Sequence, residues 1–105
     1  MTRKLVIRPQ AVIDLDEQAL YIARDSIEVG LRLYLAAHGA YARLLDMPEL
    51  GSRRELAIPE LNGLRMWPIP AFSNHLIFYR PSDAGVEIVR VLHASRDIPV
   101  ILEEQ

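Results

Sequence analysis

The sequence predicts an α+β protein in which an N-terminal strand and an αα-hairpin precede a three-stranded, mostly antiparallel sheet. Two observations support this order. Apolar residues recur at helical spacing through the first half of the chain, and after residue 63 the pattern changes to short β-prone runs separated by turns. With 105 residues the chain is predicted to form a single domain, residues 1–105, because two separate cores would not fit in that length.

The first strand and first helix are predicted near the N-terminus. Residues 4–8 alternate like a short strand, and Pro9 stops it but suits the first turn of a helix. The helix then shows an apolar stripe at spacings of three and four, formed by Val12, Leu15, Ala19 and Ile22. Acidic residues near its start suit the positive end of the helix dipole, namely Asp14, Asp16 and Glu17.

A second helix is predicted to follow a break near Asp25, because Asp25 and Glu28 have the spacing of a capping box. Its apolar and aromatic residues repeat at alternating steps of four and three: Ile27, Leu31, Tyr34, His38, Tyr41 and Leu45. We expect this seam to pack against the first helix. Gly30 should weaken the start of the helix, and Pro48 and Gly51 should close it.

The second half of the chain is predicted to be mainly strands. Residues 49–63 are interpreted as a connector, and residues 64–69 as a strand that Pro68 and Pro70 confine to an edge of the sheet or distort.

A hairpin is predicted next, with strands at residues 75–80 and 86–92 joined by a turn at residues 81–85. The apolar residues 98–102 fit either a terminal turn of helix or an extended segment.

Composition excludes several classes of protein. The net charge is −2 without a basic excess, so we expect no direct sequence-specific nucleic-acid binding. No cysteine is present, and the histidines lack ligand spacing, so we expect no metal and no cofactor. No run approaches the ~20 apolar residues of a membrane helix, and Arg8 and Pro9 interrupt the N-terminus too soon for a signal peptide. A cytoplasmic location without a membrane partner is therefore expected.

Four motifs in the second half appear in a specific order. They are Gly63-Leu64-Arg65, Leu76-Ile77-Phe78-Tyr79-Arg80-Pro81, Val86-Glu87-Ile88-Val89-Arg90-Val91-Leu92-His93 and Arg96-Asp97-Ile98. This ordered set resembles the C-terminal half of ParE-type toxins of the RelE/ParE superfamily. The first half agrees more loosely, through Ala11, Asp14-Leu15, Ile22, Pro48 and Gly51.

The resemblance implies a RelE/ParE-like fold and a toxin held silent by a cognate antitoxin. ParE members act on DNA gyrase, trapping it with cleaved DNA, whereas RelE-like relatives cut messenger RNA on the ribosome. One fold carries many functions, so the site has to decide between them. Residues 98–104 are apolar or acidic, and Glu103 and Glu104 would repel a bound phosphate, which favours gyrase.

The candidate residues for contact with the target or the antitoxin are Arg65, Trp67, Tyr79, Arg80, His93, Arg96 and Asp97. For a gyrase inhibitor that acts by binding, none is catalytic. A ribosome-dependent ribonuclease would instead need a proton acceptor, a proton donor and cations from Arg65, Tyr79, Arg80, His93 and Arg96.

Structural roles are the alternative for each of these residues. Tyr79 fits a half-buried core aromatic, Trp67 fits core packing equally well, and a single histidine at the end of a strand, as His93 is, is usually hydrogen-bonded structure. Arg96 and Asp97 would stabilise the turn by ion pairing or capping. A third hypothesis is a degenerate toxin that serves mainly as antitoxin partner and transcriptional co-repressor.

Overall fold

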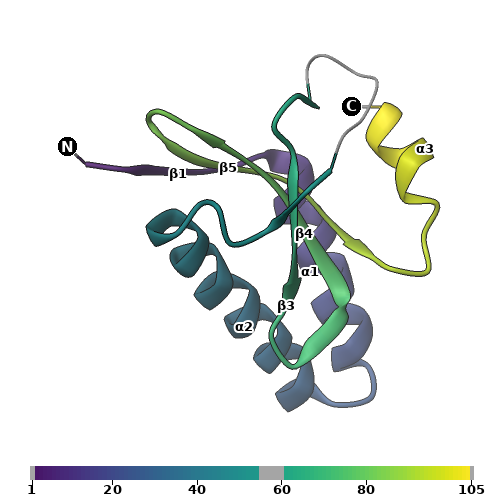
Figure 1. Ribbon diagram of the computed structural model, residues 1–105. Coiled ribbons are helices and arrows are strands. Elements are labelled where there is room, and N and C mark those ends of the chain that lie inside the picture. The colour runs from purple at the N-terminus through teal and green to yellow at the C-terminus, as the bar shows by residue number, and fades with distance from the viewer. Residues whose placement is uncertain (1, 55–60, 105) are drawn as a thin grey trace.

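The computed structural model describes residues 2–54 and 61–104 of the chain. In chain order the elements are β1 (Lys4–Ile7), α1 (Pro9–Ala23), α2 (Ile27–Asp46), β2 (Ser52–Arg53), β3 (Arg65–Ile69), β4 (Phe72–Ser82), β5 (Gly85–His93) and α3 (Ile98–Glu103). The strands form one mixed sheet of order β1-β5-β4-β3-β2 (Figure 1). The α+β class and the order of the main elements are confirmed.

The predicted three-stranded sheet is wrong, because the described residues form five strands. The N-terminal strand joins the sheet in parallel, with Lys4 opposite Gly85 and Ile7 opposite Ile88. Gly85 permits this approach, because its φ is +153° and a Cβ there would collide with the backbone of Lys4. The other strand missing from the prediction is β2, which lies in the predicted connector. Residues 55–60 of that connector lie outside the described residues.

Both faces of the sheet are covered. Alternate residues of β4 point to opposite sides: Ile77 and Tyr79 belong to one cluster of buried residues, and Phe78 belongs to another. The first cluster also contains Leu15 of α1 and Leu33 of α2, so the helical hairpin packs on that face. The second cluster lies under α3, and its buried members are Leu61, Leu64, Phe78, Val89, Leu92 and Leu102.

The predicted seam of α2 lies alongside α1, but only its C-terminal part reaches the core, through Tyr41 and Leu45. The buried residues of this helix are Gly30, Leu33, Ala37, Ala40, Tyr41 and Leu44. Of the predicted seam only Tyr41 is among them; Ile27 is 78% exposed and Leu31 is 55% exposed. Gly30 allows the two helices to approach closely at this point, because a Cβ there would lie 2.6 Å from the carbonyl oxygen of Ala19.

The ends of several elements also differ from the prediction. Ser26, rather than Asp25, caps α2, since its hydroxyl accepts a hydrogen bond from the Val29 N–H at 3.2 Å. The predicted turn at residues 81–85 is shorter, because β4 continues through Ser82. The C-terminal apolar segment is helical, as one of the two predicted alternatives had it.

Strand β3 lies near the edge of the sheet, as its prolines predict. Its neighbour β2 pairs only with Arg65 and Met66, so Pro68 lies on the open part of the edge. A tight turn through Pro70 and Ala71 then leads into β4. Ala71 has a φ of +68°, the conformation that the third residue of a type II turn requires and that glycine usually supplies.

Candidate functional site

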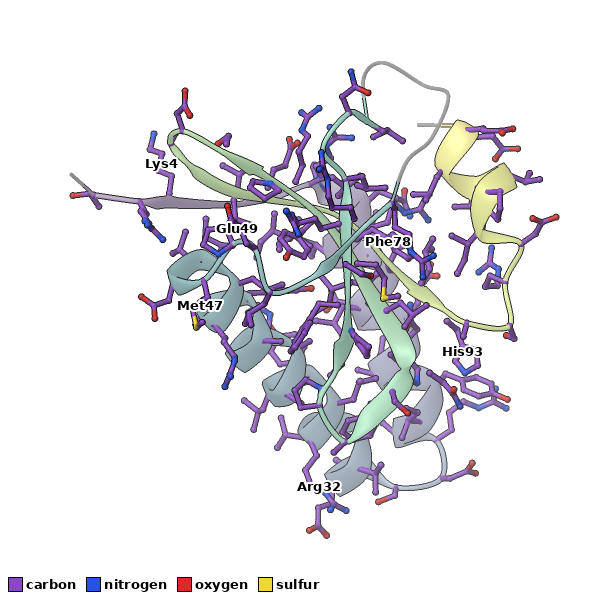
Figure 2. The ribbon with its side chains drawn as sticks, viewed as in Figure 1. Lys4, Arg32, Met47, Glu49, Phe78 and His93 are labelled. Carbon is purple, nitrogen blue, oxygen red and sulfur yellow. The ribbon has the colours of Figure 1, made fainter. Side chains whose placement is uncertain are left out.

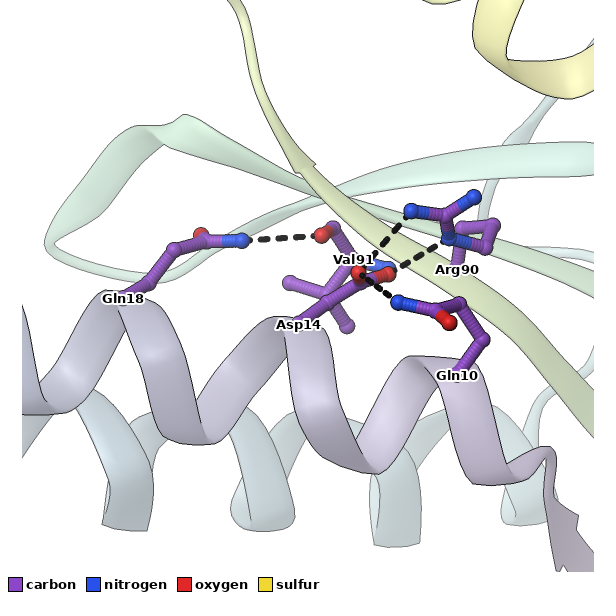
Figure 3. A network of polar contacts seen from close by, with 5 residues as sticks. All are labelled: Gln10, Asp14, Gln18, Arg90 and Val91. Carbon is purple, nitrogen blue, oxygen red and sulfur yellow. Dashed lines mark hydrogen bonds and ion pairs between the residues drawn. The ribbon is translucent and has the colours of Figure 1, made fainter.

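The most buried charge in the described residues is the carboxylate of Asp14 on α1, which is 6% exposed (Figure 3). Arg90 of β5 binds it with two donors, Nε to Oδ2 at 2.7 Å and Nη2 to Oδ1 at 2.9 Å. The Val91 N–H donates to Oδ2 at 3.1 Å, and Gln10 Nε2 donates to Oδ1 at 3.2 Å. Asp14 therefore joins the helical hairpin to the sheet.

The sequence interpretation placed Asp14 with the helix dipole and missed this role. No acidic residue lies in the first turn of α1, so that explanation does not hold. A signal was present, because Asp14 lies on the same helical face as Ala11 and beside Leu15, both of which are buried. A carboxylate on an apolar face requires a buried cation. Arg90 can meet it where β5 carries a bulge, since Val89 has no partner on β4.

Arg65 and Tyr79, two of the predicted site residues, form one corner of the structure. They lie opposite each other on β3 and β4 and both bind the chain that follows α2. The Tyr79 hydroxyl donates to the carbonyl of Pro48 and accepts from the Gly51 N–H, both at 2.7 Å. Arg65 Nη1 donates to the carbonyl of Gly51 at 2.6 Å.

This corner is closed to partners at Tyr79, which is 0% exposed. Burial raises the pKa of the Tyr79 phenol, and the hydrogen bond from Gly51 and the charge of Arg65 oppose that rise. Gly51 is required here, because a Cβ would lie 2.5 Å from the Tyr79 hydroxyl oxygen. Arg65 and Tyr79 thus shape the corner after α2.

Arg80 lies beside the corner and shares the carboxylate of Glu87 with Arg8. Arg80 Nη2 lies 3.0 Å from Oε1 of Glu87, and Arg8 Nε lies 3.1 Å from Oε2. The pKa of Glu87 is lowered, chiefly by the hydrogen bond from Arg8 and then by the charges of both arginines against the opposing effect of burial. This triad joins the start of α1 to the β4–β5 hairpin.

His93 lies at the other end of the β4–β5 pair, opposite His75. Their ring centroids are 4.9 Å apart in an edge-on arrangement. The Oε1 atom of Gln18 on α1 lies 2.6 Å from Nδ1 of His75, and its Nε2 donates to the carbonyl of Val91 at 2.9 Å. The Ser95 N–H donates to Nδ1 of His93 at 3.1 Å. Burial, and then the neighbouring His93, lower the pKa of His75.

The remaining candidates differ in exposure. Trp67 is half-buried against the core, and its indole N–H has no partner in the described part of the chain. Arg96 and Asp97 are exposed in the turn before α3. Asp97 makes no side-chain capping hydrogen bond, and the Arg96 side chain makes no hydrogen bond or ion pair within residues 2–54 and 61–104. The predicted ion pairing or capping by these two residues is therefore not seen.

The structure does not bring the proposed ribonuclease residues together. His93 pairs with His75, which precedes Tyr79 by four residues on β4, a separation of roughly 13 Å at about 3.3 Å per residue. Figure 2 likewise shows His93 well away from Glu49, whose carbonyl accepts a bond from Arg65. Arg65, Tyr79 and Arg80 form one group, and His93 and Arg96 form another.

The outer face of the helical hairpin is the main exposed apolar feature. A groove of about 340 Å³ runs between α1 and α2, and we call it the hairpin groove. Its lining residues are Asp16, Ala19, Leu20, Ala23, Ile27, Gly30, Leu31 and Tyr34. Leu20, Ile27 and Leu31 project much of their apolar surface into solvent. Such a surface is typical of a site for another protein.

Within residues 2–54 and 61–104 no group of three or more histidine, aspartate or glutamate side chains is placed to hold a metal ion. In the same ranges no helix is both long and apolar enough to cross a membrane.

Comparison with known proteins gives one finding. A search of curated proteins returns no match. The family described as "ParE toxin of type II toxin-antitoxin system, parDE" matches residues 5–98, which include the hairpin, the corner and the His75–His93 pair. The chain therefore belongs to the ParE toxin family of type II toxin–antitoxin systems.

Proposed function

We propose that this toxin inhibits DNA gyrase by binding it in the cytoplasm, without catalysis of its own, and that its antitoxin covers the hairpin groove. Membership of the ParE toxin family supports a toxin with a cognate antitoxin. The resemblance to ParE-type toxins, rather than to RelE-like relatives, implies DNA gyrase as the target.

The separation of the reactive side chains carries the proposal. RNA cleavage through the 2′-hydroxyl needs an acid, a base and a cation around one phosphate. Tyr79 is buried, Arg65 binds backbone carbonyls, and Arg80 shares Glu87 with Arg8. Of the groups that would have to cooperate with His93, only Arg96 lies beside it, and the other three are engaged elsewhere. An inhibitor that acts by binding needs no such constellation.

The antitoxin is proposed to lay an amphipathic helix in the hairpin groove. The groove has exposed apolar residues on both helices, and an amphipathic helix would bury them in the manner of other helix-in-groove complexes. An extended tail of the antitoxin would continue from the groove across the sheet.

The candidates for contact with gyrase differ in accessibility. Arg96 and Asp97 are exposed and His93 lies beside them, so we propose that these three contact the target. The other four candidates are proposed to have a structural role, in which their contacts within the toxin hold the surrounding surface in place: Arg65, Trp67, Tyr79 and Arg80.

The test is plasmid supercoiling by purified gyrase with the toxin added. The expected result is inhibition with accumulation of cleaved plasmid, reversed by antitoxin. Arg96→Glu should weaken the inhibition, and Arg32→Glu, at a distant exposed position on α2 (Figure 2), should not. Absence of any effect at micromolar toxin would contradict the proposal, and codon-specific cleavage of translated RNA would support the ribonuclease instead.

A further inference from the structure

A small hollow continues the hairpin groove toward β1, and we call it the Tyr41 pocket. Its volume is about 130 Å³, and Leu15, Asp16, Tyr34, His38 and Tyr41 are among the residues that line it. Asp16 and Tyr34 also line the hairpin groove, so the two hollows are adjacent. A chain segment lying in the groove can therefore extend a side chain into the pocket.

The hydroxyl of Tyr41 is an unpaired polar group. Tyr41 is 1% exposed, and its hydroxyl oxygen has no hydrogen-bond partner among the described residues. A buried hydroxyl without a partner is unfavourable, and native structures rarely leave one in that state. Burial and then the charge of Asp14, with Tyr34 and Asp16 following, raise the pKa of this phenol. The hydroxyl is therefore protonated and lies close to the acidic side of α1.

Asp16 supplies the second unpaired group. The carboxylate of Asp14 is neutralised by Arg90, but the Asp16 carboxylate makes no hydrogen bond or ion pair within residues 2–54 and 61–104. Asp16 is exposed, so it lies where an incoming residue can reach it. The pocket thus combines apolar walls with a carboxylate and a hydroxyl that have no partner in the described part of the chain.

We propose that the Tyr41 pocket receives one lysine or arginine side chain of the antitoxin segment that fills the hairpin groove. The N–H groups of a cation can bind the Asp16 carboxylate and the Tyr41 hydroxyl oxygen together. Its aliphatic stem packs on the walls formed by Leu15 and Tyr34. An acidic side chain is disfavoured, because Asp16 repels it. The inference rests on the antitoxin part of the proposed function and is independent of the gyrase part.

The test uses the purified toxin and the antitoxin encoded beside it, with affinity measured by calorimetry. Tyr41→Phe and Asp16→Asn should each weaken binding by about tenfold or more, the size expected for a hydrogen bond to a charged group. Matched controls on α1 are Tyr21→Phe and Glu17→Gln, whose side chains are exposed and lie outside both hollows. Both controls should bind within twofold of the unmodified toxin.

A second measurement separates binding from folding. Tyr41→Phe removes a hydroxyl that the free toxin leaves unpaired, so its thermal unfolding midpoint should stay equal or rise. Asp16→Asn should also make the affinity less sensitive to salt, because it removes one ion pair of the complex.

Affinities of Tyr41→Phe and Asp16→Asn within twofold of the unmodified toxin would overturn the pocket assignment and leave the antitoxin partnership intact. Failure of the unmodified toxin to bind the antitoxin would overturn both. Failure to inhibit gyrase changes neither measurement.

Discussion

The sheet and the outer face of the helical hairpin differ in whether their polar and apolar groups have partners. On the sheet, Asp14 is bound by Arg90, and the Tyr79 hydroxyl both donates and accepts. On the hairpin, Leu31 is exposed and the Tyr41 hydroxyl has no partner in the described part of the chain. Apart from the Trp67 indole N–H, the polar groups named in the first region have partners within the described residues, whereas the second region has the exposed apolar surface typical of a site for another protein.

This comparison teaches that residue type alone does not locate a binding site. Arginine, tyrosine and histidine in the strands suggest function, yet most of them satisfy one another or the backbone. The apolar helix residues suggest core, yet several of them are the most exposed apolar groups described. Each substitution below breaks one region while leaving the other unchanged.

The largest expected effect is the loss of stability in Asp14→Ala. The change leaves Arg90 buried without its counter-ion, and breaking such a pair typically costs about 3–5 kcal/mol. Chemical denaturation would measure the free energy of unfolding. Asp16→Ala, two residues along the same helix, should change it by less than about 0.5 kcal/mol. Equal effects of the two substitutions would contradict the structural role of Asp14.

A smaller loss is expected for Tyr79→Phe. The substitution removes the bond to the Pro48 carbonyl and leaves the buried Gly51 N–H unpaired, which costs about 1–3 kcal/mol. The free energy of unfolding measures this effect, and the exposed Tyr21→Phe serves as the control. Unchanged stability in Tyr79→Phe would show that the corner does not depend on its hydroxyl.

Leu31→Gln should show the opposite pattern from the two changes above. Because Leu31 is exposed in the free toxin, the free energy of unfolding should change by less than about 0.5 kcal/mol. Antitoxin affinity should fall by about tenfold, the scale of burying part of a leucine side chain. Leu35→Gln is the matched control, since Leu35 is exposed on the same helix but does not line the groove. Equal affinities for both variants would place the antitoxin elsewhere.

The smallest effect concerns acid stability and Glu87. Because Arg8 and Arg80 lower the pKa of this carboxyl in the folded state, its contribution is fully present above the unfolded value of 4.5. That contribution is lost as the pH falls below 4.5 through the lowered folded value. Glu87→Gln should therefore flatten the dependence of the melting temperature on pH below 4.5. An unchanged pH profile would mean that the triad adds nothing to stability.

The sequence predicts the α+β class, the two long helices and the β4–β5 hairpin because periodicity reports local structure directly. It does not predict how the N-terminal strand joins the sheet. The pairing of Lys4 with Gly85 depends on a close backbone approach between residues far apart in the chain. The two-residue strand β2 is likewise too short to leave a pattern.

The face of α2 was predicted from one set of large apolar residues, and the structure mainly buries another set, in which small residues are mixed with leucines. Leu33, Ala37 and Leu44 repeat at spacings of four and seven and form the core side together with Gly30. Because α2 carries two apolar stripes, the sequence alone does not show which stripe faces the core. The close packing of Gly30 against Ala19 selects the buried one. The partners of Arg65 and Tyr79 could not be predicted from the sequence either, because they are backbone groups of the chain that follows α2 and meet these side chains only in the folded structure.

A toxin that acts by binding should inhibit gyrase in proportion to the number of toxin molecules bound, and a titration at fixed gyrase concentration measures this. Cleaved plasmid should increase with added toxin, saturate near one toxin per binding site on gyrase, and decrease again when antitoxin is added. Cleavage of translated messenger RNA by toxin present at far below one molecule per ribosome, with gyrase unaffected, would contradict the account.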